Sequence, residues 1–331
     1  MRSKIKPTSP SIDLHTHIRG TLEYEDIIEL SFENDIPILK HQLQLYKNRA
    51  WSSFSEFLEV YHGLGRVVHE ARDWTRLVES YLSKVAKTET IYVELMVSPM
   101  HIVNNKISYI ELISAIQLGA DRAFERYGIR SAIVITCVRH NGPEEAIALA
   151  EMVTRNPSEI VVGFGLTGDE TRYEPSDFSK AFKIAKDAGL MLTAHTGEWL
   201  PASSVLETVK TLELNRVGHG IKVAYDKEIM TELIERKVGF EVCISSNIAL
   251  NVVGNLHFHP LLTLYKAGAM VSLGADDPAY FGTIPKDEYE LAHTLIGGDF
   301  HSLVRQLNAN AIAISFASEG VRTELRKLAQ I

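Results

Sequence analysis

The stretch SIDLHTHIRGTL places two histidines, His15 and His17, one residue apart near the start of the chain. Because side chains alternate across a β-strand, residues i and i+2 point to the same face, so both imidazoles would project together. Two imidazoles held in this way suit a divalent metal, although an isolated His-x-His pair is more often part of an ordinary core. A second pair, His257 and His259, falls in an expected loop, and we interpret it as structural.

Candidates for further metal ligands follow other expected strands. His195 lies in MLTAHTGE and Asp276 follows MVSLGA, so three imidazoles and one carboxylate could surround one metal and leave a position for water. Asp276 and Asp277 could instead cap a helix that begins at Pro278, a common role for Asp. The only cysteines, Cys137 and Cys243, are far apart, so neither a disulfide framework nor a thiolate metal site is expected.

Two further titratable residues extend this set. Glu198, three residues after His195, could shuttle protons beside a metal if burial raises its pKa, or could be an exposed charge. His219, between two glycines in VGHGIKV, could hold an attacking water or take its proton, or could simply occupy a turn. Metal-assisted hydrolysis is the reaction class that would use all of these groups.

Eight short runs rich in Val and Ile must position these residues. The runs are SIDLHTH, IYVELMVSP, RSAIVITCVRH, IVVGFGLTG, MLTAHTGE, RVGHGIKV, VGFEVCISSN and MVSLGADDP. Their alternation with amphipathic helical segments predicts a closed parallel (β/α)8 (TIM) barrel, in which active sites lie at the carboxyl ends of the strands. A doubly wound sheet, the alternative, would need a glycine-rich phosphate loop after an early strand, and none follows the first strand. The tail from Ser302 to Ile331 is expected to add helices without chemistry.

We expect residues 1–331 to form a single domain, because no Pro-, Gly- or Ser-rich linker interrupts the chain. The segment 23–87 is too long for one crossover helix, so we expect it to supply a helical lid over the carboxyl mouth of the barrel. Phe54, Phe57 and Leu58 in this segment are candidates to line the lid, although such a helix is more often plain core.

Composition limits the partners. The 331 residues carry a formal net charge of -8, which disfavours binding to a nucleic-acid backbone and favours a small-molecule ligand. The basic start MRSKIKPTSP precedes no apolar run of signal-peptide length, and no stretch approaches the ~20 apolar residues of a membrane span. We therefore expect a cytoplasmic protein, with its oligomeric state left open.

Six motifs carry a resemblance to a known family. DLHTHIRGTL, GFGLTGDE, AHTGE, RVGHG, EVCISSN and SLGADDPAYFGT occur in the order and approximate spacing of the adenosine deaminase family, which also includes adenine deaminases and deaminases of modified adenine nucleosides. The resemblance implies a hydrolytic deaminase with one zinc ion per chain on a (β/α)8 barrel. The zinc ligands that it implies are His15, His17, His195 and Asp276.

The resemblance also implies roles for residues around the substrate. Glu198 would protonate the purine N1, and His219 would orient the zinc-activated water that attacks C6. Asp277 would bind N7, the backbone NH of Gly168 would reach N3, and His17 would border the substrate.

Arg19 departs from this pattern. The adenosine-specific members that the chain resembles carry an acidic residue at this place, which accepts a hydrogen bond from the ribose 5'-hydroxyl, and an arginine cannot accept that bond. One hypothesis is that Arg19 binds an anionic group on the 5' side of the substrate, such as the benzoate of 6-aminodeoxyfutalosine. The other is that it pairs with a protein carboxylate such as Glu23 or Glu25.

We therefore expect deamination at C6 of adenosine or a 5'-modified adenine nucleoside. A deaminase of 6-aminodeoxyfutalosine or of adenine is the alternative, and the GDE at 168–170 favours a nucleoside over the free base. A more remote alternative is another metal-dependent amidohydrolase, but such enzymes often hold two metals bridged by a modified lysine or a carboxylate, and no lysine ends the fourth expected strand. The complete set of ligands argues against a binding protein without catalysis.

Overall fold

The computed structural model describes residues 9–101 and 107–331. Eight parallel strands pair in sequence order and close into a barrel, with Asp13 of the first strand paired to Leu273 of the last. The strands are β1 (Ser11–His17), β2 (Thr90–Val97), β3 (Arg130–Val138), β4 (Val161–Thr167), β5 (Met191–Thr196), β6 (Arg216–His219), β7 (Gly239–Val242) and β8 (Met270–Leu273). The predicted (β/α)8 barrel is confirmed.

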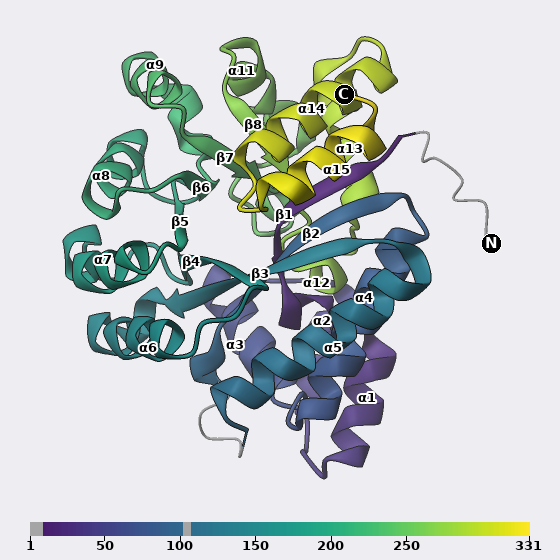
Figure 1. Ribbon diagram of the computed structural model, residues 1–331. Coiled ribbons are helices and arrows are strands. Elements are labelled where there is room, and N and C mark those ends of the chain that lie inside the picture. Colours follow the sequence, from purple (N-terminus) through teal and green to yellow (C-terminus); the bar gives the residue numbers. More distant parts are fainter. Residues whose placement is uncertain (1–8, 102–106) are drawn as a thin grey trace.

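Helices between the strands cover the outside of the barrel, and Figure 1 shows α6 to α9 following one another around it. These outer helices are α5 (Tyr109–Tyr127), α6 (Pro143–Arg155), α7 (Ser179–Asp187), α8 (Ala202–Leu212), α9 (Lys227–Glu235) and α11 (Leu261–Lys266). Local signals set their ends: the capping box of Ser108 and Glu111 starts α5, and Gly128 ends it in a left-handed conformation.

Four helices fill the segment between β1 and β2, where extra helices were expected. They are α1 (Tyr24–Glu33), α2 (Lys40–Asn48), α3 (Phe54–Gly65) and α4 (Ala71–Ala86). The hydroxyl of Ser53 caps α3 by accepting a hydrogen bond from the backbone NH of Glu56 at 3.2 Å. In Figure 1, α1 to α3 gather on one side of the barrel.

The remaining helices follow the later strands. They are α10 (Ile244–Ala249), α12 (Pro278–Phe281), α13 (Pro285–Ile296), α14 (Phe300–Ile314) and α15 (Glu319–Ala329). Two expected strands extended too far at their carboxyl ends. The residues ISSN, expected in the seventh strand, belong to α10, and residues 139–141, after the third strand, form a short 3-10 helix. Apolar content alone does not mark where a buried strand passes into a buried helix. Figure 1 shows α14 beside β1 and β8.

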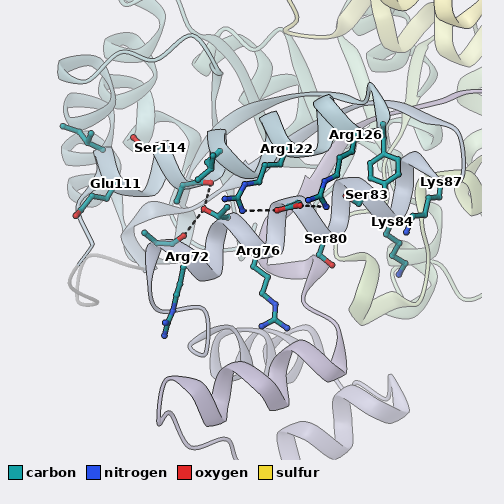
Figure 2. Close-up of a pocket in the computed structure, with 17 residues that line it drawn as sticks. Arg72, Arg76, Ser80, Ser83, Lys84, Lys87, Glu111, Ser114, Arg122 and Arg126 are labelled. Atoms are coloured by element: carbon teal, nitrogen blue, oxygen red, sulfur yellow. Dashed lines mark hydrogen bonds and ion pairs between the residues drawn. The ribbon is translucent and has the colours of Figure 1, made fainter. Parts of the chain in front are cut away.

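A large groove of about 1060 Å³ lies between α4 and α5, apart from the strand ends (Figure 2). Its basic side chains are largely paired with acids. Arg122 and Arg126 both contact the carboxylate of Glu79, at 3.3 and 2.9 Å. Arg76 pairs with Glu29 of α1. None of the candidate catalytic residues is among the described residues that line this groove. Within residues 9–101 and 107–331, no helix has the length and apolar character needed to cross a membrane.

Candidate active site at the barrel mouth

Hydrogen bonds between the ends of β1 and β8 bring the His-x-His pair to Asp276. The backbone NH of His17 donates to the carbonyl of Asp276, and that of Asp276 to the carbonyl of His15, both at 2.8 Å. The carboxylate of Asp13 accepts from the NH groups of His15 and Ala275, at 2.8 and 3.1 Å. As a result, Nε2 of His17 lies 3.3 Å and Nε2 of His15 lies 3.7 Å from Oδ1 of Asp276.

His195, from β5, completes this cluster. Its ring centroid lies 4.8 Å from that of His15 and 5.2 Å from that of His17. One ring nitrogen from each of these three histidines lies within 4.8 Å of the others. Nε2 of His15 and Nε2 of His195 are buried and have no hydrogen-bond partner among the described residues. Buried imidazole nitrogens left without partners beside a carboxylate fit a metal site.

The charges of the cluster also fit a cation. Burial lowers the pKa of His15 and of His195, which favours the neutral imidazole that a metal binds. Burial would also lower the pKa of His17, but the carboxylates of Asp277 and Asp276 outweigh it and raise that pKa to about 9. Asp276 and Asp277 thus favour a positive charge beside His17. The four residues predicted as ligands lie together in an arrangement that one divalent metal would satisfy.

Glu198 and His219 lie on the other side of this cluster. Oε2 of Glu198 is 3.8 Å from Nε2 of His219, which is 4.0 Å from Oδ2 of Asp276. Burial raises the pKa of Glu198 to about 7. His219 and Asp276 both have positive φ angles, 61° and 59°, a left-handed conformation that is uncommon outside glycine but that Asp and His adopt more readily than most residues.

Asn247 holds this pair, and His259 in turn supports Asn247. The amide nitrogen of Asn247 lies 3.4 Å from Oε1 of Glu198 and 3.3 Å from Nδ1 of His219. Nε2 of His259 in turn lies 3.3 Å from the amide oxygen of Asn247. If Asn247 donates to Nδ1, the Nε2 of His219 carries its proton toward the cavity. His259 was interpreted as a structural residue, and its contact with Asn247 agrees with that interpretation. His257 is exposed.

Glu170, the last residue of the GDE motif, anchors the loop that carries Glu198. Its carboxylate accepts hydrogen bonds from the backbone NH of Gly197, of Trp199 at 2.7 Å and of Leu200 at 3.2 Å. These three NH groups flank Glu198. The GDE motif could be recognised in the sequence. The backbone NH groups that bind Glu170, 27 to 30 residues further along the chain, could not be predicted from it.

Asp277 and Gly168 border the cavity at the barrel mouth. Asp277 is 5% exposed, and its Oδ1 has no hydrogen-bond partner among the described residues. Burial and the neighbouring Asp276 raise the pKa of Asp277. Gly168 has a φ of 92°, and a Cβ there would lie 2.9 Å from Nδ1 of His140. Any larger residue would therefore strain the backbone and crowd this wall.

The cavity enclosed by these residues has a volume of about 60 Å³. Its walls come from the strand ends and from α3. The lining residues are His17, Phe54, Phe57, Leu58, Tyr61, His62, Ser98, Val138, His140, Thr167, Gly168, His195, Glu198, His219, Leu250, Asp276 and Asp277. Phe54, Phe57 and Leu58, the three lid candidates, all lie in this wall, and the ring of Phe57 stacks on Phe281 at 5.2 Å.

Arg19 follows the His-x-His pair and contacts α3. It is buried and is not among the lining residues of the described cavity. Its Nη2 donates to the carbonyl of His62 at 3.3 Å, and its Cζ lies 5.3 Å from the ring centre of Tyr61. Gly65 makes room for it, because a Cβ there would lie 2.5 Å from Arg19 Cζ.

The carboxylates offered as partners for Arg19 are also engaged elsewhere or distant from it. Glu23 binds Lys84 at 2.5 Å, and Glu25 is exposed. The substrate-binding role expected for Arg19 stays a prediction. The guanidinium instead holds α3 against the short helix after β1, a contact that the spacing of the motif could not reveal.

A closed (β/α)8 barrel with titratable side chains gathered at its carboxyl mouth is the arrangement of an enzyme active site. The adenosine deaminase family model matches residues 10–330. The adenine deaminase of Rhizobium meliloti (strain 1021) is 34% identical over 315 residues, 95% of this chain and 96% of that protein. The chain belongs to the adenosine deaminase family, which confirms the resemblance of the six motifs.

Solved structures agree with this assignment. The crystal structure of the adenine deaminase of Arthrobacter aurescens is similar with a TM-score of 0.91 and 27% identity, covering 97% of this chain and 98% of that one. An amidohydrolase of Burkholderia ambifaria, solved with bound Zn, shares the fold with a TM-score of 0.87 at 24% identity, over 98% and 92% of the two chains. The chain is thus an adenosine deaminase-like hydrolase that acts on the C–N bond of a cyclic amidine.

Proposed function

We propose that this enzyme hydrolyses adenine at C6 to hypoxanthine and ammonia. The sequence motifs predicted a nucleoside, with adenine as the alternative, but the relatives named adenine deaminase favour the alternative. The observation in the site that carries the proposal is the size of the cavity. Its volume of about 60 Å³ is far below the ~300–1,000 Å³ typical of sites for drug-sized ligands, which favours a bare planar base.

We further propose that His15, His17, His195 and Asp276 hold one metal ion, with zinc as the ion that suits three imidazoles and a carboxylate. The bound Zn of the Burkholderia ambifaria amidohydrolase supports this choice. When bound, the metal supplies the Lewis acidity that makes water nucleophilic near neutral pH.

Glu198 delivers a proton to the ring in this proposal. Attack of water at C6 breaks the aromaticity of the ring and moves electron density onto N1. A proton donated to N1 therefore stabilises the transition state more than the ground state. Burial, which raises the pKa of Glu198 to about 7, keeps the acid form available near neutrality. His219, held by Asn247 at 3.3 Å, orients the attacking water by donating its Nε2 proton in a hydrogen bond.

Asp277 and Gly168 orient the base. A protonated Asp277 donates a hydrogen bond to N7, which is consistent with its raised pKa and its unpartnered Oδ1. The backbone NH of Gly168 donates to N3. We propose that α3 acts as the lid, because Phe54 and Phe57 cover the cavity with apolar rings and exclude water from it.

An adenine nucleoside is the second candidate substrate. The polar side chains of Ser98, His62 and His140 also line the cavity, and they could bind the hydroxyl groups of a sugar if α3 moved outward. A 5' anion is a weaker candidate, because Arg19 contacts α3 rather than the cavity.

The test is a parallel assay of the zinc-loaded protein with adenine, adenosine and AMP, followed by the change in ultraviolet absorbance and by ammonia release. The proposal predicts that adenine has the highest kcat/KM. A higher kcat/KM for adenosine would assign the nucleoside instead, and failure of all three compounds would refute deamination of adenine-type substrates.

A further inference from the structure

A chain of buried charged side chains runs through the interior of the barrel beneath the site. Glu241 of β7, Arg216 of β6 and Glu94 of β2 are each 0% exposed. Nε of Arg216 donates to Oε1 of Glu241, and its Nη2 donates to Oε2 of Glu94. Two carboxylates and one guanidinium therefore occupy space that branched apolar residues usually fill in such barrels.

The upper end of this chain reaches a proposed metal ligand. Oε2 of Glu241 lies 2.6 Å from Nδ1 of His15. Its other oxygen accepts from Arg216 and from the hydroxyl of Thr193, the latter at 2.7 Å. Both oxygens of Glu241 are thus held in place. A neutral His15 must then donate its Nδ1 proton to Glu241, which leaves the lone pair of Nε2 directed at the cluster.

The lower end reaches the segment 314–316, which begins at the last residue of α14 and runs toward α15. Nη1 of Arg216 donates to the carbonyl of Ile314 at 3.2 Å, and its Cζ lies 3.6 Å from the ring centre of Phe316. The backbone NH of Phe316 donates to Oε1 of Glu94 at 2.7 Å. The carboxy-terminal tail, where no chemistry was expected, therefore contacts the charges that lead to His15.

We infer that Arg216 is a positioning residue for the metal site, and that it acts through Glu241 on the tautomer and orientation of His15. The segment 314–316 and Glu94 hold Arg216 from below. Burying ionic groups is costly, and an apolar filling would close the barrel at least as well. The group that needs this chain is the imidazole of His15, because ligating histidines depend on such partners for their orientation. The inference rests on the proposed metal site and not on the identity of the substrate.

The test uses the double variant Glu94→Gln/Arg216→Met. It removes one negative and one positive charge, so the net charge of the buried group of Glu94, Arg216 and Glu241 is unchanged. Zinc affinity is measured by competition with a chelator. The tautomer of His15 is read from imidazole ¹⁵N shifts in the metal-free protein. We expect the Nδ1–H form in the wild type, its loss in the variant, and zinc affinity lowered by about 10- to 100-fold.

Two further variants separate positioning from folding. Glu241→Gln keeps the size of the side chain, and its amide can donate to His15, which would place the imidazole proton on Nε2 and lower zinc affinity. Arg130→Met is the matched control, because it breaks the pair between Arg130 and Glu324 of α15, 2.7 Å long, without touching the buried chain. It should leave zinc affinity unchanged.

The outcomes are distinct. A folded double variant with the zinc affinity and His15 tautomer of the wild type would overturn the inference. If that variant does not fold, Glu241→Gln decides, and unchanged affinity there would overturn it equally. A wild-type protein that binds no zinc would overturn the proposed metal site together with the inference, whereas a different substrate preference would affect only the proposed reaction.

Discussion

Replacing Glu198 with Gln removes the proposed proton donor and keeps the shape of the side chain. Glu198 is 4% exposed, and Asn247 donates to its Oε1 at 3.4 Å. A glutamine retains that hydrogen bond through its amide oxygen, so the cavity should keep its form. What the variant loses is the proton for N1, which is needed only as the transition state forms.

The size of the loss follows from this role. General acid catalysis contributes about 10²- to 10⁴-fold, so kcat/KM should fall by about that factor, or about 3–5 kcal/mol of transition-state stabilisation. Burial raises the pKa of Glu198 to about 7, so the acid form is present below that pH and is lost above it. Wild-type activity should therefore decline as the pH rises through about 7, and this decline should be absent from the variant.

Glu288→Gln is the matched control. Glu288 is 1% exposed and also has a pKa raised to about 7 by burial, but it binds the NH of Ile244 at 2.8 Å and the hydroxyl of Thr283 at 2.9 Å. It is not among the lining residues of the described cavity. This variant should lose about 1–3 kcal/mol of stability and keep its turnover. Initial rates over a series of pH values test both variants, and Glu198→Gln with near wild-type kcat/KM and an unchanged pH profile would refute the reasoning.

Three further predictions concern the metal, the lid and the loop. Chelation should abolish activity and zinc should restore it at one ion per chain, as measured by atomic absorption; full activity in metal-free protein would contradict the proposed cofactor. Arg19→Met removes the hydrogen bond to the carbonyl of His62, so KM should rise by about tenfold with little change in kcat, and steady-state kinetics showing an unchanged KM would count against the lid. Glu170→Gln weakens the anchor of the 197–200 loop, so kcat should fall by about tenfold or more; an unaltered kcat would remove Glu170 from the positioning of Glu198.

The sequence was sufficient to predict the barrel and the residues around its mouth. Strand alternation placed His15 and His17 on one face, and the parallel order of the strands brought their carboxyl ends, with His195 and Asp276, to one end of the barrel. These inferences use only local periodicity and a closed topology. Both are properties that a single sequence displays.

Contacts between distant segments could not be predicted in this way. Arg19 meets the carbonyl of His62, 43 residues away, because Gly65 leaves space on α3. Phe316 meets Glu94 across 222 residues, so the carboxy-terminal tail enters the barrel interior. The proposed preference for the base rests on how closely α3 covers the cavity, and this coverage comes from packing between distant segments rather than from motif spacing.

The most direct test of the whole account is a crystal structure of the zinc-loaded protein with hypoxanthine, the product of the proposed reaction, with data collected at the zinc absorption edge. We predict one anomalous peak between His15, His17, His195 and Asp276. The base should lie in the cavity, with N1 facing Glu198 and N7 facing Asp277. A metal bound elsewhere, or a base turned so that N1 faces away from Glu198, would contradict the account.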